Sequence, residues 1–116
     1  MTDHTDLLFA PSRDLALDGE VPFNRHHLIG VPDITGVYVI RDLTGPLYVG
    51  RTCNLRQRCA QHIESTHNPD LAQAVLDPVG PVTFGWITVQ SEFVVRAEQR
   101  LIALLRPRCN KVLVPA

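Results

Sequence analysis

Several features that would assign a functional class are missing from this 116-residue chain. No apolar run approaches the ~20 residues of a membrane-spanning helix, and the acidic, polar start does not resemble a secretory signal. The cysteines (Cys53, Cys59 and Cys109) are odd in number and lack CxxC spacing, which argues against a disulfide framework and favours a reducing, cytoplasmic location. Hydrophobic residues make up 45% of the chain, enough for one core, so we expect a single globular domain.

A strong net charge is also missing. The formal charge is −1, which taken alone argues against a nucleic-acid-binding protein. The average hides two unequal parts, since residues 1–34 carry −4 and residues 35–116 carry +3. We therefore expect an acidic N-terminal extension (1–34), helical or loosely packed, and a separate domain (35–116). We also expect the extension to cover the basic face and weaken nucleic-acid binding.

Two strands in the first half of the domain are predicted to form a hairpin. Residues 35–41 and 47–50 are rich in β-branched and aromatic side chains, and residues 42–45 have the composition of a hairpin turn. Because side chains alternate along each strand, Tyr38 and Tyr48 can lie on one face of this hairpin.

Three helices and a third strand are predicted after the hairpin. Asn54 is a good N-cap for a helix of about ten residues. Asn68 and Pro69 open a second helix that ends before Pro78 and Gly80. A strand follows at 82–89, and a last helix, capped by Ser91, continues to Pro107.

Arg58 and His62 are the first candidates for chemistry. They are four residues apart, so their side chains share one helix face beside the apolar residues Leu55, Cys59 and Ile63. An arginine bordering a buried face needs a partner, and a phosphate or a carboxylate would serve. The alternative is an exposed arginine whose aliphatic stem covers apolar surface.

Glu98 is the second candidate, because it lies within the apolar stripe of the last helix. Its partner could be an arginine or a divalent cation such as Mg²⁺, which accepts one or two carboxylates together with substrate phosphates. Taken alone, the residues favour the ion pair. A zinc site is disfavoured, because the cysteines and histidines of this region lack a known ligand spacing.

The motifs together resemble the GIY-YIG nuclease domain. The resemblance covers residues 36–110, and valine replaces isoleucine in both signature triplets. It rests on five segments in order: Gly36-Val37-Tyr38, Tyr48-Val49-Gly50-Arg51, Asn54 to Arg58 with His62, Glu98 with Leu101-Ile102, and Pro107 to Asn110.

The resemblance implies an α/β fold of the α+β type, with a three-stranded antiparallel sheet flanked by helices. It also implies a hydrolytic phosphodiesterase that uses Mg²⁺ or Mn²⁺, and it reverses the preference at Glu98 in favour of metal binding. It places catalytic functions on six residues: Tyr38, Tyr48, Arg58, His62, Glu98 and Asn110.

The resemblance implies a role for each of these residues. Tyr38 would act as general base or position the water, with Tyr48 assisting and His62 relaying a proton. Arg58 would stabilise charge on the phosphoryl oxygens, and Asn110 would fix the geometry of the site.

DNA, single-stranded or structured, is the expected substrate, in preference to RNA or plain duplex. Five residues could contact backbone phosphates: Arg51, Arg56, Arg106, Arg108 and Lys111. The chain shows no appended helix-turn-helix or zinc finger, so a protein partner could supply targeting. Two alternatives to a self-sufficient nuclease remain: a partner-dependent nucleic-acid-binding or scaffold module, and a regulatory protein acting through its acidic extension.

Overall fold

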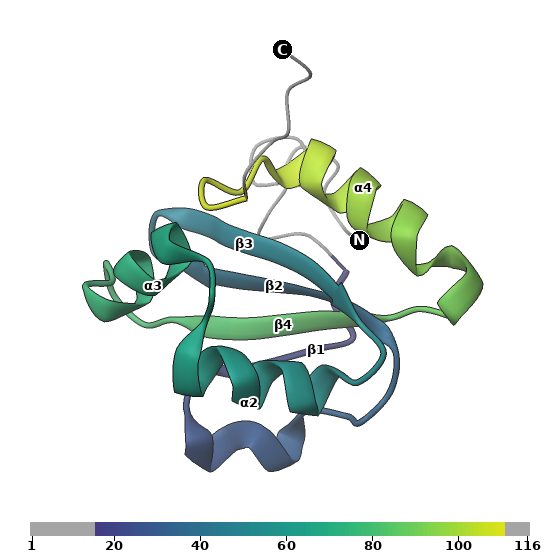
Figure 1. The fold of residues 1–116 in the computed structure, drawn as a ribbon, viewed down its shortest axis with the longest axis horizontal. Helices are drawn as coiled ribbons and strands as arrows, with labels where there is room; N and C mark the ends of the chain where they lie inside the picture. The colour runs from purple at the N-terminus through teal and green to yellow at the C-terminus, as the bar shows by residue number, and fades with distance from the viewer. Residues whose placement is uncertain (1–15, 111–116) are drawn as a thin grey trace, which may run out of the picture.

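The computed structural model describes residues 16–110, which form an antiparallel sheet with helices on both faces (Figure 1). The sheet has four strands in the order β1-β4-β2-β3. The strands are β1 (Gly19–Pro22), β2 (Gly36–Asp42), β3 (Gly45–Thr52) and β4 (Thr83–Thr88). The α-helices are α2 (Leu55–Ser65), α3 (Pro69–Leu76) and α4 (Val94–Leu105), and the 3₁₀ helices are η1 (Arg25–Gly30) and η2 (Ser91–Phe93).

The predicted hairpin is confirmed in β2 and β3. Tyr38 pairs with Gly50 and Ile40 pairs with Tyr48, so both tyrosines lie on the same face. The turn is held by Asp42, whose Oδ1 accepts hydrogen bonds from the backbone N–H and the hydroxyl of Thr44.

The expected antiparallel sheet flanked by helices is confirmed, with one strand more than the three predicted, because residues 19–22 add the edge strand β1. This segment pairs with β4, and its Glu20 carboxylate binds the Arg41 guanidinium at 2.6 Å. Asp18 accepts hydrogen bonds from the backbone and hydroxyl of Thr88. These two acidic residues of the leader are therefore tied to the sheet, not free to cover a basic face. Residues 1–15 lie outside the described part of the chain.

Each face of the sheet packs on a different helix. Leu55 and Cys59 of α2 share one core with Leu71 of α3, and Leu101 of α4 belongs to a second core on the other face. Asn54 caps α2 as predicted, its side chain accepting a hydrogen bond from the N–H of Gln57. This arrangement presents one face of α2 to the two tyrosines.

The start of the last helix differs from the sequence prediction. Ser91 was expected to cap it, but residues 91–93 form the 3₁₀ turn η2 and α4 begins at Val94. Phe93 occupies the N-cap position and makes no side-chain cap bond. Among the helices of residues 16–110, none is long and apolar enough to cross a membrane.

Candidate active site

Two glycines at the centre of this site allow neighbouring residues to lie close to the backbone. A Cβ at Gly50 would collide with the hydroxyl of Tyr38 on the neighbouring strand. A Cβ at Gly36 would collide with the carbonyl oxygen of Ile87 and with Leu55 of α2. Glycine is thus required at both positions by packing, and the position of the Tyr38 hydroxyl depends on it.

Three aromatic rings form a cluster between the sheet and α2. The ring centroids of Tyr38 and Tyr48 are 6.2 Å apart. The centroid of His62 lies 5.4 Å from that of Tyr38 and 5.6 Å from that of Tyr48. Phe84 of β4 stacks on Tyr38, with 5.0 Å between the two ring centroids. Aromatic packing therefore restricts how the rings can turn.

A chain of hydrogen bonds runs through this cluster. The Tyr38 hydroxyl lies 2.7 Å from His62 Nε2, and His62 Nδ1 lies 3.0 Å from Thr66 Oγ1. Burial lowers the pKa of His62 to about 4, with Arg58 as the next cause, so the ring is neutral near pH 7. Burial raises the pKa of both tyrosines. Thr66 is not among the residues predicted from the sequence, although its spacing of four residues from His62 is compatible with this contact.

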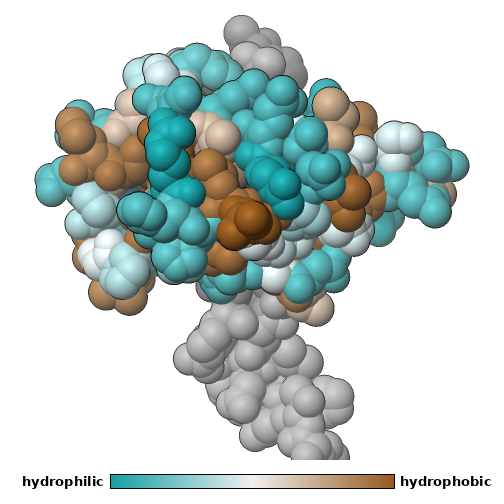
Figure 2. All heavy atoms as spheres, turned by 90° about the horizontal axis from the view of Figure 1, so that it is seen from below, coloured by the Kyte–Doolittle hydropathy of each residue, from teal (hydrophilic) through white to brown (hydrophobic). Residues whose placement is uncertain are grey.

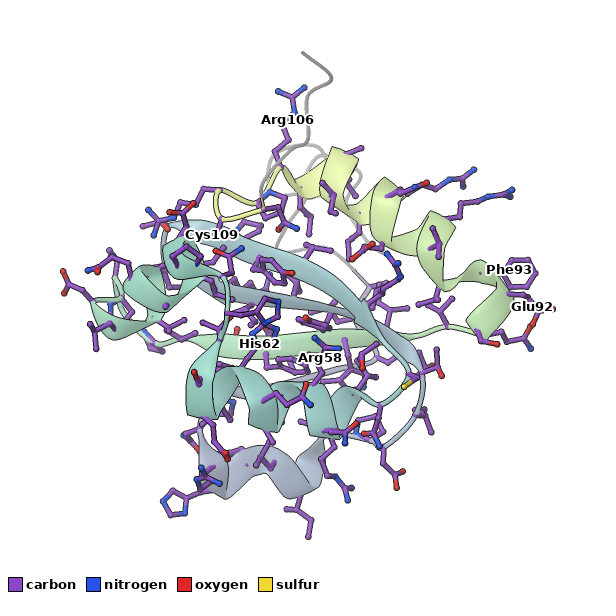
Figure 3. All side chains as sticks on the ribbon, in the orientation of Figure 1. Arg58, His62, Glu92, Phe93, Arg106 and Cys109 are labelled. Carbon is purple, nitrogen blue, oxygen red and sulfur yellow. The ribbon has the colours of Figure 1, made fainter. Side chains whose placement is uncertain are left out.

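Arg58 extends from α2 toward the sheet, beside His62 (Figure 3). Among buried side-chain nitrogen and oxygen atoms of residues 16–110, its Nε alone has no hydrogen-bond partner. Its charge acts on the ring cluster, opposing the pKa rise of both tyrosines. A buried donor without a partner is costly, so this atom fits a site that an anion completes.

Glu98 of α4 meets Arg51 of β3 in an ion pair, with 2.6 Å between Arg51 Nη1 and Glu98 Oε1. The Glu98 side chain is 16% exposed and its charge raises the pKa of Tyr48. No group of three or more metal-binding side chains occurs within the described residues. A single carboxylate suits Mg²⁺, which takes its other oxygens from water and phosphate, better than zinc.

Asn110 lies on the free edge of β3 and does not join the ring cluster. Its Oδ1 accepts a hydrogen bond from the N–H of Val49, and its Nδ2 donates to the Val49 carbonyl, both at 2.8 Å. Next to it, the N–H of Cys109 donates to the Leu47 carbonyl. The side chain and its neighbour thereby pair the edge of the strand that carries Tyr48.

The other predicted phosphate-binding residues are dispersed. Arg56 donates to the carbonyls of Val31 and Ile29, and Arg108 lies 3.9 Å from Asp42. Arg106 ends α4 in the left-handed conformation and points away from the body (Figure 3). Lys111 lies outside the described residues. Of the four that the structure describes, only Arg51 forms an ion pair with one of the six predicted catalytic residues.

The face formed by η1 and α2 is mixed in character. Figure 2 shows hydrophobic patches on it, bordered by hydrophilic side chains. Ile29 of η1 is 84% exposed. A nucleic-acid backbone therefore has no uniformly polar surface to follow on this side.

Comparison with known proteins connects this geometry to one family. A family model described as the GIY-YIG catalytic domain matches residues 34–112. UvrABC system protein C of Trichlorobacter lovleyi is 32% identical over 87 residues, which are 74% of this chain and 14% of that protein. The chain thus spans a small part of this relative's length.

Two solved structures have the same fold. Both are GIY-YIG N-terminal endonuclease domains of UvrC from Thermotoga maritima, the first bound to magnesium and the second a tyrosine-to-phenylalanine variant bound to its divalent cation. The TM-score is 0.61 for each, with 20% and 21% identity. The matches cover 75% and 76% of this chain and 94% of each domain.

Proposed function

Because this chain belongs to the GIY-YIG family, we propose that it is a Mg²⁺-dependent endonuclease that hydrolyses phosphodiester bonds in DNA. UvrABC system protein C is a relative, and the solved UvrC domain of the same fold holds a magnesium ion described as catalytic. From these relatives we propose Mg²⁺ as the metal and DNA as the substrate of this chain.

The unpartnered Arg58 Nε is the observation that carries the proposal. It is buried beside a ring cluster on which both Arg58 and Glu98 exert their charges. A phosphodiester entering here would give Nε an acceptor and would place its developing negative charge against the guanidinium. Stabilising that charge is the role we assign to Arg58.

Glu98 is the residue that would hold the metal. Mg²⁺ bound there would act as a Lewis acid on the phosphate and stabilise the leaving oxygen. Arg51 now binds the same carboxylate at 2.6 Å, so it must share or release Glu98 when a cation arrives. A released Arg51 could contact a substrate phosphate, which is the role expected from the sequence.

The rings supply water positioning and proton transfer. The raised pKa of Tyr38 keeps its hydroxyl protonated, so Tyr38 alone is a poor base near neutral pH. It can accept a proton from the attacking water if its own proton passes to His62 at the same time, across the 2.7 Å contact. Tyr48, half-buried beside it, would orient the water.

Asn110 and Arg56 act on the site from outside. Asn110 holds the backbone of Val49, the residue after Tyr48, so we assign it a positioning function. Arg56 is bound to backbone carbonyls and stabilises the approach of η1 to α2. Arg106 and Arg108 are left as distal phosphate contacts, and Lys111 stays a phosphate contact expected from the sequence alone.

Single-stranded or structured DNA is the proposed substrate class. The basic surplus of residues 35–116 is only +3, which favours weak, salt-sensitive contacts over a firm grip on duplex. A protein partner that delivers the substrate fits the same weak charge.

A Mg²⁺-dependent cleavage assay tests the proposal, using single-stranded, duplex and branched DNA and a matching RNA. We expect cleavage of single-stranded or branched DNA, abolished in Glu98→Gln and in Arg58→Ala. Activity of Glu98→Gln equal to the wild type would refute the assignment. Arg96→Ala removes a charge from an exposed position of α4 and serves as the control.

A partner-dependent binding module is the second candidate, and the Arg51–Glu98 ion pair favours it. A carboxylate already neutralised by an arginine is a poorer ligand for a cation, so cutting could require a partner that separates the two. This function predicts DNA binding without cleavage by the isolated chain, and cleavage restored by Arg51→Ala.

A further inference from the structure

Thr66 lies outside the family motif, and its contacts in the fold suggest a function. It follows α2 directly, as the C-cap residue, and its hydroxyl lies 3.0 Å from His62 Nδ1. The same oxygen accepts a hydrogen bond from the N–H of Asn68 at 3.3 Å. Asn68 in turn caps α3 through the N–H of Leu71. The position of the Thr66 hydroxyl is therefore set by the junction of two helices.

Only one placement of the protons satisfies the hydrogen bonds of both buried side chains, Tyr38 and His62. Tyr38 is only 2% exposed, and its hydroxyl has His62 Nε2 as its hydrogen-bonding partner among residues 16–110. If Nε2 carried the proton, it would donate to the Tyr38 oxygen and leave the buried phenolic hydrogen without an acceptor. Nε2 must therefore be the acceptor, and a neutral ring then carries its proton on Nδ1, where Thr66 Oγ1 accepts it.

We propose that Thr66 is a positioning residue that holds His62 in the Nδ1–H tautomer, with Nε2 free to take the Tyr38 proton. This inference rests on the proposed hydrolysis for its catalytic consequence, but the tautomer itself is a property of the free protein. In the step it serves, a water O–H bond breaks as the proton moves to Tyr38 Oη. The phenolic proton moves to His62 Nε2, and the resulting hydroxide forms a bond to phosphorus as the bond between phosphorus and the leaving oxygen breaks. The leaving oxygen takes its proton from solvent water.

A cavity beside this pair gives the relay a route to solvent. It has a volume of about 440 Å³ and lies between α2 and α3. His62 and Thr66 both line it, together with apolar side chains of Phe23, Val75 and Val82. The Nδ1–H of His62 faces Thr66, so a proton taken up on Nε2 can be balanced by release from Nδ1 toward this cavity.

The first test is the tautomer of His62 in the free, ¹⁵N-labelled protein, read from long-range ¹H–¹⁵N couplings. We expect Nδ1–H in the wild type and in Thr66→Ser, and a mixture or Nε2–H in Thr66→Val. An Nε2–H tautomer in the wild type would overturn the inference, and so would an unchanged Nδ1–H in Thr66→Val. This readout does not depend on whether the protein cleaves DNA.

The second test is kinetic. We expect kcat of Thr66→Val to fall on the order of tenfold to a hundredfold with KM unchanged, and Thr66→Ser to restore it. Thr52→Val is the matched control, because the Thr52 hydroxyl makes equivalent local bonds with Asn54 at the other end of α2 and does not contact His62. Equal losses in the two valine variants would mean that Thr66 acts only on stability, and would refute its positioning role. A wild type without activity would refute the proposed hydrolysis and leave the tautomer result to decide the inference.

Discussion

Arg51 and Glu98 connect strand β3 to helix α4 through a 2.6 Å ion pair, although they are 47 residues apart in the sequence. The Arg51 side chain is 47% exposed and that of Glu98 only 16%, so the arginine covers the carboxylate. Glu98 is also the residue expected to bind the metal. A positive group at hydrogen-bond distance from that carboxylate must compete with a dication for it.

Replacing Arg51 by alanine is therefore expected to tighten Mn²⁺ binding, on the order of tenfold, in the absence of nucleic acid. Calorimetry or Mn²⁺ electron paramagnetic resonance would measure the change, and Glu98→Gln should abolish binding. The exposed Arg96→Ala, a charge removed from the same helix as Glu98, controls for a general electrostatic effect. If the Arg51 and Arg96 variants bind Mn²⁺ equally, the ion pair does not compete with the cation.

Arg58 and Arg56, on the same helix, should respond oppositely to replacement by methionine. Arg58→Met removes a buried donor without a partner, so the free energy of unfolding should rise by roughly 1 kcal/mol while cleavage is lost. Arg56→Met removes hydrogen bonds to the carbonyls of Val31 and Ile29, so it should destabilise the protein by about 1–2 kcal/mol.

Urea denaturation of both variants, together with the cleavage assay, measures this contrast. The two substitutions remove the same charge from the same helix, so each serves as the control for the other. A lower stability of Arg58→Met would show that its guanidinium has a structural partner in solution.

The parts of the structure that the sequence predicted are those set by local chemistry. The period of two along β2 and β3 put Tyr38 and Tyr48 on one face, and Asn54 capped α2. Strand β1 was missed because its pairing with β4 is non-local, and a segment of four residues with a proline and a glycine carries little strand signal.

The contacts of the candidate site were harder to predict than its residues. For Glu98 the sequence left an arginine and a metal as possible partners, because the packing of α4 on β3 determines which groups meet. Thr66 was missed for a related reason, since its contact with His62 depends on how α2 ends.

His62 should make stability depend on pH. Its pKa is lowered from 6.5 to about 4 in the folded protein, so the unfolded chain binds more protons between these two values. Stability therefore rises with pH through this window and is lost as the pH falls from about 6.5 toward about 4. We expect wild-type stability to drop by roughly 2 kcal/mol between pH 7 and pH 5 from this residue alone.

Denaturant titrations of the wild type and of His62→Gln across pH 5–7 would isolate this contribution. Glutamine retains an acceptor for Tyr38 but cannot titrate. The stability of the variant should therefore fall by roughly 2 kcal/mol less than that of the wild type between pH 7 and pH 5. The pKa values of Asp18, Glu20 and Asp42 are lowered in the folded protein. Their contributions to stability are therefore lost only as the pH falls below the ordinary pKa values of carboxyl groups, which lie below the range of this titration. Parallel pH profiles for the two proteins would mean that His62 is not buried as a neutral ring.

Asn110 should protect the edge of β3 at a single residue. Its side chain pairs both backbone groups of Val49, so Asn110→Ala is expected to expose the Val49 amide and to cost about 1–2 kcal/mol of stability. Asn110→Asp retains an acceptor for the Val49 N–H but places a carboxylate against the Val49 carbonyl, so it should preserve only part of the protection. Hydrogen exchange read by NMR measures this directly, with the amide of Phe84 in the central strand β4 as the internal reference. An acceleration at Val49 no larger than that at Phe84 would indicate global destabilisation alone, and would contradict a local function for Asn110 at this edge.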